Sequence, residues 1–300
     1  MSYSLLDSLQ AIKLFSEIWT HPANRKAPYQ ALINAIHWQI TKRMTGRPSD
    51  ISYHGLKLRC YPDSHSASRA VYFSGLPDYR EMRFILDFLR PGDQFIDVGA
   101  NIGLYTLLAL SAVGPTGYVH SFEPNPTVVR VLNESLQLNS ADNVAVHEIG
   151  LADTEGVVAF SMTEDDCTAH IVEQSASSAR TEIPIGRLDR ILDSVPYAMA
   201  KFDIEGYEPF AIRGASRLLQ EHNPPVMLIE MAGYSERYGI TTPDFIAELE
   251  QLGYFIAIYH PDSRELQPTI RPWEIPVENV LAVSKERKQF VEDRVKEQMA

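Results

Sequence analysis

From residue 95 onward, short apolar runs alternate with longer segments in which apolar positions recur every three or four residues. The short runs have the length of buried strands, and the longer segments have the spacing of amphipathic helices. The predicted strands are 95–99, 118–122, 144–149, 198–204, 226–231, 254–259 and 279–284, and the predicted helices between them are 103–113, 126–138, 207–220 and 242–252. This alternation predicts an α/β, Rossmann-like fold, in which helices cover both faces of a mostly parallel sheet.

One segment interrupts the alternation. Residues 156–162 and 180–185 have the pattern of two additional strands, and the linker 163–179 between them is polar and rich in Ser and Ala. A loop of that length is usually either functional or disordered, and the sequence leaves both open. His170 lies in this linker, where a mobile general base would be useful.

Helical patterns also stand at both ends of the chain. One covers 4–20, a second begins at Pro28 and ends before Gly46, and a charged one covers 285–300. We expect three parts, which are an N-terminal helical arm at 1–50, a central domain at 51–284 with an inserted hairpin and loop at 156–185, and a C-terminal helical tail at 285–300. The arm could be a cap, a dimer surface or an element packed on the domain, and arm or tail could join two copies as a homodimer.

In both arm helices the apolar residues recur at helical spacing. They are Leu5, Leu9, Ile12, Phe15 and Trp19 in the first helix, and Leu32, Ile33, Ile36, Ile40 and Met44 in the second. This spacing gives each helix one apolar side.

Composition narrows the class of protein. The formal net charge is −12, which argues against general binding to nucleic acid phosphates. The two cysteines, Cys60 and Cys167, are far apart, so neither a zinc cluster nor a disulfide framework is expected. No apolar run is long enough for a membrane span and no secretory signal is apparent, so we expect a cytoplasmic protein.

A glycine-containing turn follows the first predicted strand of the sheet. Asp97 ends the strand, and Gly99, Asn101 and Gly103 shape the turn into the next helix. In the dinucleotide fingerprint the middle glycine admits a pyrophosphate, but Asn101 stands in that place here, which disfavours NAD and FAD. A ligand with a ribose and no phosphate fits better, and S-adenosylmethionine is such a ligand. Ala100 belongs to the same turn, directly after the strand.

A second acid follows the next strand. Glu123 and Pro124 come about 20 residues after the glycines, which is the spacing that nucleotide-binding folds require. The Glu123 carboxylate could accept hydrogen bonds from both ribose hydroxyls, because Asn125 is better placed to cap the following helix. After the third strand, Leu151 and Ala152 are suited to an adenine face.

The segment around residue 203 is the second dense motif. Lys201, Asp203 and Glu205 alternate along a strand and its end. Lys201 could neutralise one of the acids as a structural ion pair, or Asp203 could face the acceptor and take its proton as a general base. Together with Glu230 the two acids could also hold Mg²⁺, but no spacing demands a metal, and we expect none.

In these motifs the chain resembles the FkbM family of S-adenosylmethionine-dependent methyltransferases. The resemblance covers about 72–232 and is carried by 97–103, 122–124, 150–153, 188–189, 201–208 and 228–230. It implies the class I methyltransferase fold, which is a seven-stranded sheet with the last strand antiparallel. It also implies that Asp97, Gly99, Asn101 and Gly103 line the methionine end of the cofactor, and Glu123 its ribose.

The same resemblance implies O-methylation of a hydroxyl on a sugar, a glycan or a secondary metabolite. The partner would then be a small-molecule or glycan acceptor. Because the sulfonium is already activated, the enzyme mainly aligns the reacting atoms, and a base takes the hydroxyl proton late. Asp203 or Glu205 is the expected base, with His170 behind them. The alternatives are an NAD-linked oxidoreductase and a non-catalytic partner subunit that keeps the fold.

Overall fold

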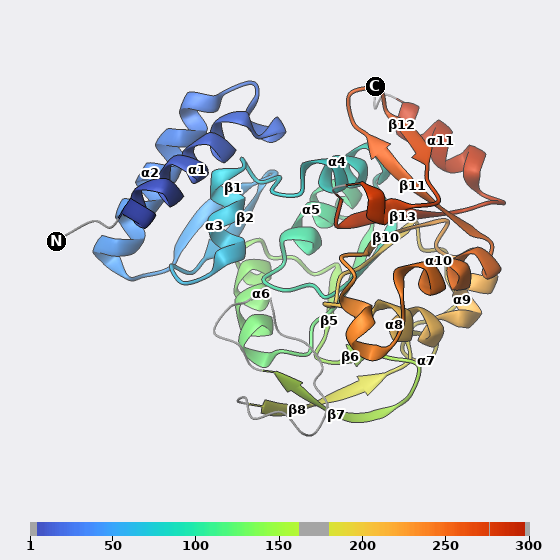
Figure 1. The fold of residues 1–300 in the computed structure, drawn as a ribbon. Coiled ribbons are helices and arrows are strands. Elements are labelled where there is room, and N and C mark those ends of the chain that lie inside the picture. The colour runs from blue at the N-terminus through green and yellow to red at the C-terminus, as the bar shows by residue number, and fades with distance from the viewer. Residues whose placement is uncertain (1–4, 162–179, 276, 298–300) are drawn as a thin grey trace.

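A central sheet with helices on both faces organises the chain (Figure 1). The structure is a computed structural model that describes residues 5–161, 180–275 and 277–297. The predicted linker 163–179, which includes His170, lies outside the described residues. Among the helices in the described part of the chain, none has the length and apolar character needed to cross a membrane.

The sheet contains eight strands in the order β12-β11-β13-β10-β9-β3-β4-β5. In chain order they are β3 (Gln94–Val98), β4 (Tyr118–Phe122), β5 (Val144–His147), β9 (Met199–Phe202), β10 (Val226–Glu230), β11 (Tyr254–His260), β12 (Glu265–Pro268) and β13 (Asn279–Ser284). Strands β3, β4, β5, β9 and β10 run parallel, whereas β13 lies antiparallel between β10 and β11. All seven predicted strands form, and the antiparallel last strand is confirmed.

The sheet has one strand more than predicted, because β12 pairs with β11 at its edge. This segment is short and ends in Pro268, and its only buried residue is Leu266. A strand with one buried residue has no alternating pattern from which it could be recognised.

Two hydrophobic layers enclose the sheet, because neighbouring strand residues point to opposite faces. Phe95 and Met199 pack on one face, and Ile96 and Ala200 on the other. The first face is covered by α4 (Tyr79–Phe88), α5 (Leu104–Val113), α6 (Pro126–Leu138) and α11 (Lys288–Lys296), and the second by α7 (Leu188–Ile191), α8 (Glu208–Gly214), α9 (Ser216–Gln220) and α10 (Thr242–Gln251). The predicted helix 207–220 is thus two helices.

The N-terminal arm is a pair of helices that precedes a two-stranded hairpin, at the left of Figure 1. The elements of this region are α1 (Leu5–Thr20), η1 (Pro22–Asn24), α2 (Pro28–Thr45), β1 (Ser49–Tyr53), β2 (Leu56–Cys60) and α3 (His65–Tyr72). Trp38 on α2 donates a hydrogen bond to Ser68 on α3 (3.0 Å), and Asn24 donates one to the carbonyl of Tyr72 (2.8 Å). These buried contacts attach the arm to the body.

The predicted inserted strands form a small separate sheet, at the bottom of Figure 1. It has the order β6-β8-β7 and consists of β6 (Gly150–Leu151), β7 (Gly156–Ser161) and β8 (Arg180–Gly186). Two short 3-10 helices, η2 (Tyr234–Tyr238) and η3 (Pro272–Glu274), lie in the connections that follow β10 and β12. The division of the chain into arm, domain and tail stays a prediction.

Candidate functional site at the carboxyl ends of the strands

The turn after β3 touches the turn after β9. Gly99 has a φ of +79°, and a Cβ built on it would lie 1.8 Å from the backbone oxygen of Asp203. Only glycine fits there, because a side chain would collide with the neighbouring backbone. The two turns that carry the predicted site therefore meet directly beyond the sheet.

Glu123 connects the end of β4 to the same turn. One carboxylate oxygen accepts a hydrogen bond from the backbone N–H of Asn101 (3.0 Å), and the other accepts one from the N–H of Asn125 (2.9 Å). Burial raises the pKa of Glu123 to about 7, although both backbone hydrogen bonds work in the opposite direction. Asn125 caps α6 by accepting from Thr127, so Glu123 does not serve as that cap.

A buried ion pair lies beneath this turn. The Lys201 ammonium is 3.3 Å from Asp203 and 3.6 Å from Asp97, and it donates to the carbonyl oxygen of Gly99 at 2.9 Å. Burial opposes the charge on Lys201, but the two carboxylates outweigh it and raise its pKa. Burial also raises the pKa of Asp97, which accepts a hydrogen bond from Thr106 (2.6 Å). The structural ion pair considered for Lys201 therefore forms with Asp203, and Asp97 is its second partner.

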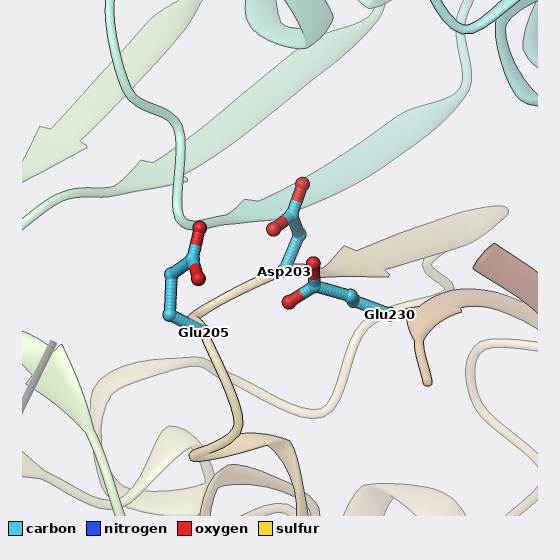
Figure 2. A group of neighbouring side chains, drawn as sticks. All are labelled: Asp203, Glu205 and Glu230. Carbon is cyan, nitrogen blue, oxygen red and sulfur yellow. The ribbon is translucent and has the colours of Figure 1, made fainter. Parts of the chain in front are cut away.

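Three carboxylates gather where β9 and β10 end. Asp203, Glu205 and Glu230 each offer an oxygen, and these oxygens lie within 4.8 Å of one another (Figure 2). Burial raises the pKa of Glu205 to about 7, and the charge of Asp203 adds to this effect. Burial raises the pKa of Glu230 still further. The negative charges of Asp203, Glu208 and Glu205 raise it in the same direction. Like charges at this distance favour a shared proton, and the same oxygens have the chemistry of a divalent cation site.

These groups surround a cavity of about 340 Å³, within the range of small-molecule sites. The predicted residues that line it are Gly99, Ala100, Asn101, Glu123, Pro124, Leu151, Asp203 and Glu205. Figure 2 shows Glu205 and Asp203 on the turn that leaves β9, with Glu230 opposite. The carboxyl ends of β3, β4, β9 and β10 thus converge on one hollow.

Three predicted cofactor residues do not line this cavity. Asp97 is fully buried against Lys201 and Thr106, beneath the turn. Gly103 faces α6 instead, because a Cβ there would lie 2.5 Å from Leu132. Ala152 is also fully buried, and its N–H already donates to the carbonyl of Gly186 (2.9 Å), so the predicted adenine contact is wrong for this residue.

Tyr105 and Asp78 are among the lining residues that escaped prediction. Tyr105 on α5 donates a hydrogen bond to Asp78 (3.0 Å), and its ring lies 4.8 Å from the Lys201 ammonium. Asp78 directly precedes α4 and also pairs with Arg69 (2.8 Å). The sequence signals a turn at Pro77 but gives no reason to bring Asp78 to a strand end so far along the chain.

A second, more open cavity of about 860 Å³ adjoins the first. Both are lined by Pro77, Asp78, Tyr234, Glu278 and Asn279. The remaining wall combines His21 and Arg25 of the arm with the connection around Trp273. The site therefore has an inner hollow at the strand ends and an outer one toward the arm.

Comparisons with known proteins were made for the sequence and the fold. The family model described as "Methyltransferase FkbM domain" matches residues 97–256. No curated protein sequence matches the chain. The methyltransferase match overturns the alternative of an NAD-linked oxidoreductase.

Similar solved structures have low sequence identity. A methyltransferase FkbM from Methylobacillus flagellatus is 19% identical with a TM-score of 0.43, over 72% of this chain and 54% of that one. A SAM-dependent O-methyltransferase from Thermotoga maritima is 14% identical with a TM-score of 0.38, over 69% and 64%. A putative methyltransferase from Streptococcus mutans, in complex with SAH, is 14% identical with a TM-score of 0.41, over 69% and 97%.

The sequence match covers more than half of the chain and includes the turn after β3, Glu123 and the carboxylate cluster. It confirms the family, the enzyme class and the cofactor expected from the motifs. The chain belongs to the FkbM family of S-adenosylmethionine-dependent methyltransferases.

Proposed function

We propose that this enzyme methylates a hydroxyl group of a neutral sugar, glycan or secondary metabolite. The observation that carries the proposal is the carboxylate cluster that lines the inner cavity, because one of its members, Glu205, has a pKa of about 7. A general base works best when its pKa lies near the pH at which the enzyme operates.

The inner cavity suits the cofactor. Each oxygen of Glu123 already accepts one backbone N–H, and a carboxylate has about four acceptor positions, so two remain for ribose hydroxyls. Leu151 offers an apolar surface for the base, and Asn101 in the turn leaves no glycine for a pyrophosphate. When bound, S-adenosylmethionine supplies a methyl group on a positively charged sulfur, which is a leaving group that needs no further activation.

We assign the acceptor proton to Glu205. As the acceptor oxygen bonds to the methyl carbon, the carbon–sulfur bond breaks, its electron pair stays on sulfur, and the hydroxyl proton passes to the Glu205 carboxylate. Asp203 is the weaker candidate, because its carboxylate is already paired with the Lys201 ammonium 3.3 Å away. Asp203 would orient the hydroxyl instead. His170, the third candidate, lies outside the described residues.

The outer cavity supports a neutral acceptor. Asp78, Glu236 and Glu278 line it, and Asp78 and Glu278 also line the inner cavity that contains the carboxylate cluster. Arg25, one of its two arginines, is paired with Asp262 at 3.2 Å. A phosphorylated acceptor would meet repulsion here, whereas hydroxyl groups donate readily to carboxylates.

Two measurements test the proposal. Calorimetry with S-adenosylhomocysteine should show binding that Glu123→Gln weakens, while the exposed-site control Glu155→Gln binds normally. Transfer of a labelled methyl group should be seen with neutral saccharides and not with their phosphate esters. Unchanged affinity in Glu123→Gln would refute the ribose assignment, and a preference for phosphorylated saccharides would refute the acceptor class.

A further inference from the structure

The outer side of α1 is apolar and uncovered. Ile12, Phe15 and Trp19 recur at helical spacing and are all exposed, Ile12 by 65%. Phe15 and Trp19 stack on each other, with ring centroids 6.2 Å apart. Ile18, on the neighbouring side of the helix, is buried. The stripe is therefore not the side by which α1 packs on the protein.

The second arm helix repeats this arrangement. Its exposed apolar stripe consists of Tyr29, Ile33, Ile36, Ile40 and Met44, while the side that packs toward α3 buries Ala31, Ala35 and Trp38. The two stripes meet where the edge of the Trp19 ring contacts Tyr29, at 4.9 Å between centroids. We call this joint surface the arm face. Large exposed apolar patches of this kind mark interaction sites.

The charge of the arm is opposite to that of the body. Residues 1–50 contain six basic and three acidic residues, which gives +3, whereas the whole chain carries −12 and the remainder therefore −15. Arg43 and Arg47 stand beside the last apolar position of α2 and are exposed. The only strongly apolar helical surface thus belongs to the positively charged end of an otherwise acidic protein, as judged from the described residues.

We propose that the arm face binds the surface of a lipid bilayer that carries anionic headgroups. Helices that lie in a bilayer surface combine Trp, Phe and aliphatic residues on one side with basic residues that meet anionic lipids. Trp and Tyr, which meet where the two stripes join, favour the boundary between headgroups and acyl chains. The acidic body is repelled by the same headgroups, so charge alone orients the protein with its arm toward the bilayer.

A second copy of the chain fits this face less well. A two-fold dimer would place the arm face against itself, and two segments of +3 would then lie together. Bilayer binding also relates the arm to the site, because His21, Pro22 and Arg25 at the end of α1 line the outer cavity. An acceptor held in or near the bilayer would then reach the cavity beside the arm.

Vesicle sedimentation of the full chain tests the proposal. We expect the protein to pellet with vesicles of phosphatidylcholine mixed with phosphatidylglycerol, and to be released from them by salt. Binding should blue-shift the Trp fluorescence, because Trp19 enters an apolar environment. The double variant Ile33→Glu and Ile36→Glu should reduce binding about tenfold or more, because glutamate is strongly unfavourable in the apolar zone.

The matched control adds the same two charges to the same helix. Gln30 and Asn34 are exposed, and their side chains bond to each other at 2.9 Å. Gln30→Glu with Asn34→Glu should retain most of the binding, which separates insertion of the arm face from its charge. Circular dichroism would show that both variants fold. Failure to pellet with the mixed vesicles would overturn the proposal, as would a dimer that the isoleucine variant dissociates.

Discussion

Lys201 donates a hydrogen bond to the carbonyl oxygen of Gly99 while its ammonium lies 3.6 Å from the fully buried carboxylate of Asp97. One side chain on β9 thus holds both the turn after β3 and Asp97, the second-last residue of β3. The family's first motif and the motif at 201–208 are parts of one buried unit.

Removing Lys201 should destabilise the protein strongly. Lys201→Met leaves Asp97 buried without its counter-charge, and breaking a buried pair in this way typically costs about 3–5 kcal/mol. Adding Asp97→Asn should restore much of that loss. Urea unfolding at neutral pH measures both, with the exposed Lys57→Met as control. Equal stability of the Lys201 and Lys57 variants would contradict this prediction.

Gly99→Ala should reduce stability and cofactor binding far more than the strain of its backbone angle alone would. The added methyl would lie 1.8 Å from the backbone oxygen of Asp203, so one of the two turns must move. Gly46 also has a positive φ, of +58°, in the left-handed helical region, but a Cβ there has nothing within 4 Å. Gly46→Ala should therefore cost only the angular strain of about 1–2 kcal/mol. Thermal unfolding and S-adenosylhomocysteine binding would show the contrast, and similar losses in both variants would rule out the collision.

The rate of methyl transfer should rise with pH through about 7. A base must be unprotonated to accept the hydroxyl proton, and the pKa of Glu205 is about 7. Glu205→Gln should lower turnover by about 10²–10⁴-fold and keep cofactor affinity, as is typical for loss of a general base. Measuring the pH–rate profiles of the wild-type and Glu205→Gln enzymes with a saccharide acceptor tests both expectations. A Glu205→Gln enzyme with the normal profile would assign the proton to another group.

Glu208 should make the protein less stable as the pH rises. Burial raises its pKa from 4.5 to about 7, so the folded protein holds this proton more tightly than the unfolded chain does. Stability is then full below about pH 4.5 and falls as the pH rises toward 7. One Glu208 oxygen accepts the N–H groups of both Ile204 (2.7 Å) and Gly206 (3.3 Å), and the glutamine oxygen can do the same.

Glu208→Gln should therefore raise the melting temperature at pH 8 and have little effect near pH 4.5. The gain at pH 8 is at most about 3 kcal/mol, from about 1.4 kcal/mol per pKa unit. Calorimetric scans at the two pH values measure the difference. The same shift at both values would show that the charge of Glu208 is not the cause.

The central strands were predictable because they are buried on both faces, which leaves continuous apolar runs such as 226–229. The edge strand β12 was not, since it buries Leu266 alone. Helix α3 was also left unassigned, although Ser64 caps it through the N–H of Ala67 (3.0 Å). The helix has only eight residues, and it begins five residues after the hairpin strand β2 ends, so its apolar pattern is too short to stand out.

For the site, the sequence predicted which residues lie at strand ends. It did not predict which of them face the cavity and which are buried beneath the turn. Asp97 is the second-last residue of β3 and Glu123 directly follows β4, yet only Glu123 reaches the cavity, because Asp97 pairs with Lys201 below the turn. Glu230 was set beside Asp203 and Glu205 as a third carboxylate, and the three do meet. The contribution of Asp78 depends on a contact between distant segments, and no local pattern encodes it.

Most of the outer cavity is built from segments outside residues 97–256, among them the end of α1, the turn at Pro77 and the connection that contains Trp273. The inner cavity draws mainly on the turns of the sheet itself. Substitutions in the walls of the outer cavity can therefore change which acceptor is methylated. They leave the cofactor site in the inner cavity intact. Proteins that share this fold can therefore differ in acceptor specificity while they keep the same cofactor site.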